Sequence, residues 1–287
     1  MNQTTRLFES LKLLMVSLMV LLFVSCSSEA QTVTTEDELM DNDEQVDQEE
    51  ESEEEEEEEE EEPENTSYDI TSILTMFDNV EAVNYSASNG TVSISTSNLP
   101  NHKSPYYADT EWADEMQTDY TGTNSNFRLN PNRIGQQNIT FSITLNPEEA
   151  TNKEATPMGP MGISRNGVVF FNQYAAGFSA LDNEINSFDQ YLGHPAGNGA
   201  YHYHIEPTFL TEEFGDDALL GLLLDGFPVY GPVENGTILS SADLDDYHGH
   251  YGATTEFPDG IYHYHVSADA PYINGDGFYG TAGSVSR

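Results

Sequence analysis

The chain has 287 residues, with 51 Asp and Glu against 8 Lys and Arg, and a formal net charge of −43 at pH 7. This charge excludes a nucleic-acid partner, because phosphates require a basic surface. A single cysteine, Cys26, leaves no pair for a disulfide within the chain, so an apolar core, a metal or both must hold the fold.

Residues 1–26 have the pattern of a bacterial lipoprotein signal peptide. A weakly basic start is followed by an apolar run over residues 11–24, which is short for a membrane span. The run ends in Leu-Phe-Val-Ser-Cys, which resembles a lipoprotein cleavage box, although an ordinary secretory signal has a similar pattern. We expect lipidation of Cys26 and a cell-envelope location. Ser27 rather than Asp follows, which favours the outer membrane or the cell surface.

Residues 27–65 are predicted to form a disordered acidic tether. Between residues 29 and 64 there are 22 Asp and Glu and no Lys or Arg, and Glu53–Glu62 is an unbroken run. Such a segment repels itself and has almost no apolar surface to bury. A store for divalent cations is the alternative interpretation of the same run.

Residues 66–287 are predicted to form one all-β domain, a mostly antiparallel sandwich or barrel-like fold. Alternating apolar and polar residues, or short apolar runs bounded by Asn, Gly and Pro, predict strands at Val92–Ser95, Ile139–Leu145, Val168–Phe171, Leu219–Leu224 and Val229–Tyr230. Turn signals recur about every dozen residues, as in β-sandwiches. Two segments, Ile70–Phe77 and Asp182–Phe188, have the composition of short helices.

One motif occurs twice in this domain. The pattern D-x-Y-x-G-H, a variable loop and then Y-H-Y-H covers residues 189–204 and again residues 245–265. It contains six of the eight histidines in the chain. Repetition of this kind indicates duplicated structure, and we expect the function to reside in these two repeats.

The repeats predict a metal site. In a strand, Y-H-Y-H places both histidines on one face, where two imidazoles can converge on one ion, and the preceding G-H offers a third imidazole from a sharply turned loop. Three imidazoles suit zinc or copper. Either each repeat holds its own ion, or the two strands pair and share one centre. The candidate ligands are His194, His202, His204, His250, His263 and His265.

Three carboxylates are candidates for a supporting role. Asp189 and Asp245 each precede the G-H histidine by five residues, and each is expected to accept a ring N–H from outside the ligand set. Asp225, which ends an apolar run, is a candidate ligand or catalytic base. His248 has no counterpart in the first repeat, and His102 stands alone, so both are expected to be structural or accessory.

The leading functional hypothesis is an envelope-anchored protein that binds copper or zinc. The first alternative is a metal-dependent hydrolase or oxidase that uses an open position on a three-histidine metal site. The second is a surface recognition module in which tyrosines bind a partner and the histidines are structural. The sequence has no G-x-S-x-G elbow, no phosphate loop and no cysteine nucleophile in the domain. It does not indicate a substrate or a protein partner.

The domain resembles the bacterial YHYH-domain proteins over roughly residues 84–280. The matching segments are the two Y-H-Y-H blocks, Leu224–Gly231, Asn98–His102, Asn166–Val168 and Pro271–Tyr272. The resemblance implies an exported protein and specifies no activity. Tyr191, Tyr247 and Gly277 stand where many members have cysteine, so thiolate ligands and the family's optional disulfides are absent.

Overall fold

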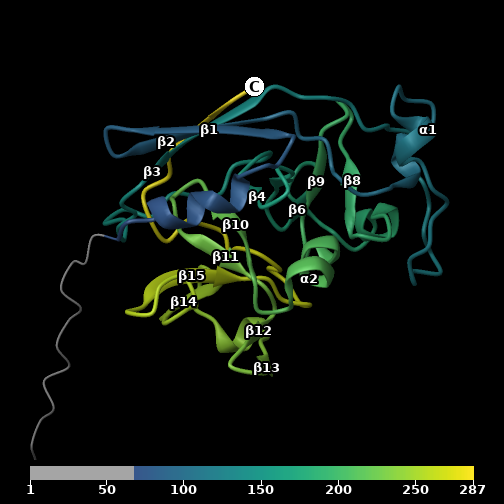
Figure 1. The fold of residues 1–287 in the computed structure, drawn as a ribbon. Coiled ribbons are helices and arrows are strands. Elements are labelled where there is room, and N and C mark those ends of the chain that lie inside the picture. The colour runs from purple at the N-terminus through teal and green to yellow at the C-terminus, as the bar shows by residue number, and fades with distance from the viewer. Residues whose placement is uncertain (1–67) are drawn as a thin grey trace, which may run out of the picture. The chain divides into compact units, whose positions relative to one another are not determined.

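The computed structural model describes residues 68–287, and these are mostly antiparallel β-sheet, which confirms the predicted all-β class (Figure 1). The predicted signal peptide, Cys26 and the acidic tether lie outside the described residues. Within the described part, no helix combines the length and apolar character that crossing a bilayer would require.

A four-stranded antiparallel sheet covers one side of the core. It has the order β1-β2-β3-β16 and consists of β1 (Val83–Ser88), β2 (Thr91–Thr96), β3 (Ile139–Thr144) and β16 (Ser284–Ser286). The alternation predicted for β2 and β3 is confirmed, because Val92, Ile94, Phe141 and Ile143 are fully buried while the Ser and Thr between them face outward or lie at the margin. These apolar residues belong to one core cluster together with strands of a second, larger sheet.

The larger sheet has eight strands in the order β14-β15-β11-β10-β4-β5-β9-β8. The strands are β4 (Gly162–Ser164), β5 (Val169–Phe170), β8 (Gly193–Pro195), β9 (Tyr201–Tyr203), β10 (Leu219–Leu223), β11 (Pro228–Tyr230), β14 (Gly249–Gly252) and β15 (Ile261–His265). The Y-H-Y-H segments therefore form β9 and β15, as predicted, with His204 immediately after the end of β9.

The G-H segments are strands, and the prediction that they lie in sharply turned loops is wrong. β8 pairs with β9 and β14 pairs with β15, so His194 lies opposite His202 and His250 lies opposite His263. The glycine before each of these histidines is required for space rather than for a turn. A Cβ at Gly193 would collide with the ring of Tyr201, and the same position in β14 is closed in the same way.

Short helices and hairpins connect the strands. They are η1 (Thr71–Phe77), η2 (Pro105–Tyr107), α1 (Ala113–Met116), η3 (Glu184–Ser187), α2 (Thr208–Phe214), η4 (Ser241–Asp243), the hairpin β6 (Tyr174–Ala175) with β7 (Ser179–Ala180), and the hairpin β12 (Val233–Glu234) with β13 (Thr237–Ile238). The two helices predicted from sequence form as the 3-10 turns η1 and η3, and η3 covers only four residues of the predicted segment.

The large sheet is an internal duplication. Strands β4, β5, β8 and β9 form one half, and β10, β11, β14 and β15 form the other with the same pairings in the same orientations. The halves meet where β4 and β10 pair antiparallel, with Ile163 opposite Leu222, Gly162 opposite Leu223 and Ser164 opposite Gly221. This reciprocal register is that of a two-fold interface. The duplicated histidine strands therefore lie towards opposite edges of one sheet.

Asp225 belongs to this duplicated framework, which corrects its assignment as a candidate ligand or base. Its carboxylate is fully buried and accepts hydrogen bonds from Tyr264 Oη at 2.6 Å and from the backbone N–H of Gly280 at 2.9 Å. Asn166 occupies the equivalent turn of the first half and contacts Tyr203 Oη at 3.3 Å. Both residues precede a glycine of positive φ. Asp225 therefore anchors a tyrosine on the face of β15 opposite the histidines.

We predict that Asp225→Ala lowers the free energy of unfolding by about 2–5 kcal/mol, because it leaves a tyrosine hydroxyl and a backbone N–H buried without an acceptor. Asp225→Asn, which retains an acceptor oxygen, is expected to cost less. Chemical denaturation of the metal-free protein measures both values. Equal and small losses for the two variants would contradict the anchoring role.

Candidate metal centres

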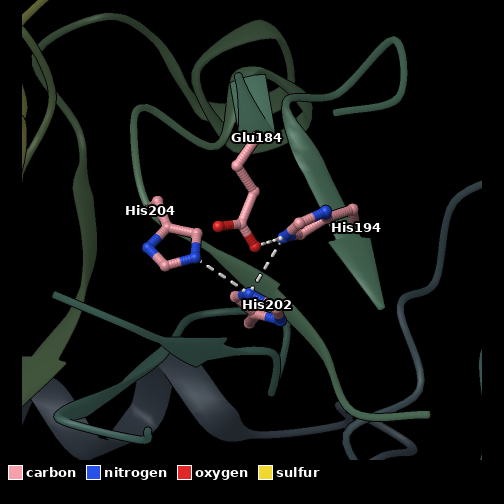
Figure 2. Close-up of side chains that lie close together, drawn as sticks. All are labelled: Glu184, His194, His202 and His204. Carbon is pink, nitrogen blue, oxygen red and sulfur yellow. Dashed lines mark hydrogen bonds and ion pairs between the residues drawn. The ribbon is translucent and has the colours of Figure 1, made fainter. Parts of the chain in front are cut away.

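In the first half, three histidines and one glutamate converge to form what we call the first centre (Figure 2). His202 Nε2 lies 3.1 Å from His194 Nε2 and 3.0 Å from His204 Nε2. Glu184 completes the group from η3, with its Oε1 3.2 Å from His194 Nε2. A tetrahedral ion with bonds of 2.0–2.1 Å separates its nitrogen ligands by roughly 3.3–3.4 Å, close to the spacing seen here.

The backbone fixes which nitrogen of the two Y-H-Y-H histidines faces the other ligands, whereas His194 Nδ1 contacts the side chains of Ser187 at 2.7 Å and Asn130 at 3.3 Å. His202 Nδ1 lies 3.0 Å from the carbonyl oxygen of Ala200, and His204 Nδ1 lies 2.6 Å from that of Asn172. A carbonyl only accepts, so each Nδ1 carries the hydrogen and, in the neutral ring, Nε2 carries a lone pair. The two lone pairs face each other and cannot form a hydrogen bond. A cation between them would convert this repulsion into attraction.

The second half repeats the arrangement to form the second centre. His250 Nε2 lies 3.2 Å from His265 Nε2, and Glu234 reaches His250 Nε2 at 3.3 Å and His263 Nε2 at 3.5 Å. Backbone carbonyls again hold the Nδ1 atoms of the strand histidines, at 2.9 Å for His263 and 2.7 Å for His265. His263 Nε2 is buried and has no hydrogen-bond partner among the described residues.

Burial keeps the Y-H-Y-H histidines neutral. Desolvation lowers the pKa of His204 to about 4 and that of His265 to about 3, and it places the pKa of His202 well below 6.5. Neighbouring imidazoles lower the pKa of His202 further. A hydrogen bond from His194 lowers the pKa of the Glu184 carboxyl, which favours its charged form. Neutral imidazoles beside a carboxylate are the protonation states that a metal ion requires.

The two glutamates could not be found from the repeat. Glu184 lies on η3, ten residues before His194, whereas Glu234 lies in the β12–β13 hairpin, sixteen residues before His250. The histidines come from equivalent strands, but the carboxylates come from different elements. No shared spacing therefore marks these two residues among the many acidic side chains of the domain.

The predicted ring contacts of Asp189 and Asp245 are replaced by tyrosine contacts. Asp189 Oδ1 accepts from Tyr201 Oη at 2.9 Å, and Asp245 Oδ1 accepts from Tyr262 Oη at 3.0 Å. Neither carboxylate hydrogen-bonds a ring of the two centres in the described part of the chain. The alternation of the strand is the reason, because the tyrosines of Y-H-Y-H point away from the histidines.

The remaining two histidines lie outside both centres. His102 Nε2 is 3.1 Å from Tyr203 Oη, and His248 Nε2 is 2.9 Å from Ser267 Oγ. Both rings are buried, and burial lowers the pKa of each to about 4. They serve as polar core residues, as expected from their positions outside the motif.

The comparison with known families agrees with this architecture. The family model described as "YHYH protein" matches residues 140–238 and 233–276, and these segments contain every residue of both centres. No curated protein and no solved structure matches the chain. Residues 140–276 of the chain thus form a YHYH domain.

Proposed function

We propose that this protein binds two divalent transition-metal ions, one in each half of the duplicated sheet, as a lipid-anchored protein of the bacterial envelope. The observation that carries the proposal is the orientation of the Y-H-Y-H histidines. In both centres the Nδ1 atoms of the two Y-H-Y-H histidines are committed to backbone carbonyls, so their Nε2 lone pairs face a group that also contains a carboxylate. A cation among these nitrogens would offset the cost of burying lone pairs without a donor.

The donor set favours zinc or copper(II). Three imidazole nitrogens and one carboxylate oxygen make four donors, the number typical of zinc, and imidazole also suits copper. No thiolate is available in the domain, so nothing selects copper(I). Residues 66–287 carry 28 acidic and 6 basic side chains, and this charge raises the local concentration of cations.

The first test is metal stoichiometry. The wild-type chain is expected to retain two zinc ions after equilibrium dialysis, and His202→Ala/His204→Ala and His263→Ala/His265→Ala are each expected to retain one. Separate centres at opposite edges of the sheet make these losses independent. Dialysis in excess Mg²⁺ saturates the acidic run at residues 53–62, and elemental analysis then counts the zinc.

The matched control is His248→Ala, which removes a buried histidine of the second half that lies outside the centre. It should keep both ions even if it is less stable. Two ions retained by both double variants would make the six histidines a polar core. Loss of both ions from either double variant would indicate one shared centre.

The second test is the pH dependence of folding in the metal-free protein. The folded-state pKa values of His202 and His204 lie below the unfolded value of about 6.5, so the unfolded chain binds more protons. Their contribution to stability is complete above pH 6.5 and is lost as the pH falls towards 4. The free energy of unfolding should therefore fall more steeply over this window in wild type than in His202→Ala/His204→Ala. Parallel slopes would contradict the assigned protonation states.

The third test addresses location. If Cys26 carries the lipid, Cys26→Ala should leave the membrane fraction or accumulate with its signal peptide uncleaved, while metal stoichiometry stays at two. Fractionation of the variant with membranes in the same mature form as wild type would show that the anchor lies elsewhere. Protease shaving of intact cells distinguishes the outer face from the periplasm.

A further inference from the structure

The two centres differ in their access to solvent. The three histidines of the first centre are at most 3% exposed. In the second centre His263 and His265 are equally buried, but the side chain of His250 is 28% exposed. One face of the second centre therefore reaches the surface.

Aromatic rings cover the first centre and leave the second more open. Phe171 stacks on His202 with ring centroids 3.9 Å apart, and Phe188 packs edge-on against His194 at 4.8 Å. In the second half, Tyr230 replaces Phe171, and its ring meets His263 only edge-on at 5.2 Å. Leu244, which is half-buried, stands in the position of Phe188.

A cavity of about 320 Å³ adjoins the second centre and is lined by its ligands Glu234, His263 and His265. Its other walls are mostly polar. Tyr230 and Thr254 form one wall, with Tyr230 Oη 2.8 Å from Thr254 Oγ1. Tyr230 Oη also donates to Glu256 Oε2 at 2.8 Å.

Gly252 keeps space beside His263 and Glu234, two ligands of the second centre. A Cβ at Gly252 would lie 3.3 Å from His263 Cε1 and 3.4 Å from Glu234 Oε1, whereas the first half has an alanine, Ala196, at the equivalent position. Together, the cavity and this glycine leave space beside Glu234 and His263 on the side of the metal position that faces the cavity.

We propose that the second centre, besides its four protein donors, keeps a fifth coordination position open to this cavity and binds a small monodentate ligand there, whereas aromatic rings close the first centre. The inference rests on the proposed metal binding and assigns a different role to each ion. Water would occupy the open position at rest, and a small neutral or singly charged oxygen or nitrogen donor would displace it. Zinc in catalytic sites can expand to five ligands, whereas structural zinc sites are closed at four.

The cavity limits the class of ligand. Its volume is at the lower end of the range for small-molecule sites, which excludes large substrates from full burial. Asp217 and Glu234 line it, so a polyanion would be repelled, while the hydroxyls of Tyr230 and Thr254 can contact a polar ligand. A small hydroxyl- or amine-bearing molecule fits both conditions.

The test uses the copper(II)-loaded full-length chain and azide, a small monodentate probe whose binding to copper produces a charge-transfer absorption band. Wild type is expected to bind one azide for every two copper ions. His202→Ala/His204→Ala, which retains the second centre, should bind azide with a similar affinity. His263→Ala/His265→Ala, which retains the first centre, should show no band.

A second variant tests whether azide reaches the metal through the cavity, and it keeps every metal-binding residue. Ala253 is exposed and lines the cavity, so Ala253→Trp should keep both copper ions but weaken azide binding at least tenfold by filling the space. Provided that two copper ions remain bound, the inference would be overturned if azide bound to both centres or to neither. Unchanged azide affinity in Ala253→Trp would also overturn it. Failure of wild type to bind copper or zinc at all would instead contradict the proposed function.

Discussion

The hydrogen bond from a histidine Nδ1 to a backbone carbonyl is the interaction on which both centres depend. It occurs four times, twice in each half, with N···O distances between 2.6 and 3.0 Å. Each bond fixes the ring orientation and the tautomer, so the opposite nitrogen must point into the cluster as an acceptor. The carbonyls belong to the sheet and its adjoining segments, so the fold itself sets the ligand geometry.

The two faces of each Y-H-Y-H strand have different roles. Its tyrosines enter the core and are held by buried polar groups, Asp189 in the first half and Asp225 in the second. Its histidines face the opposite side and form the centres. Burial raises the pKa of each of these two aspartates to about 6, and the hydrogen bonds from the tyrosines offset part of this rise by stabilising the charged carboxylate. Rigid anchoring of one face holds the ligands of the other in place.

Periodicity made the strands and the histidine sets predictable. The alternation of β2 and β3, and the paired histidines of β9 and β15, follow from a side-chain period of two. The two glutamates could not be predicted from the sequence, because Glu184 and Glu234 come from different elements and lie at different spacings from the histidines. Asp225 was misassigned because a carboxylate after an apolar run resembles a catalytic residue until its tyrosine partner is seen. The choice between one centre and two depended on the register of β4 against β10, which the sequence does not encode locally.

The central claim is that Nε2 atoms of three histidines and a carboxylate oxygen surround one ion in each half. Anomalous diffraction from zinc-soaked crystals, collected on both sides of the zinc absorption edge, tests it most directly. The account predicts two peaks per chain, each about 2.0–2.2 Å from three Nε2 atoms and from an oxygen of Glu184 or Glu234. Coordination through Nδ1, or fully occupied zinc elsewhere with both clusters empty, would contradict it.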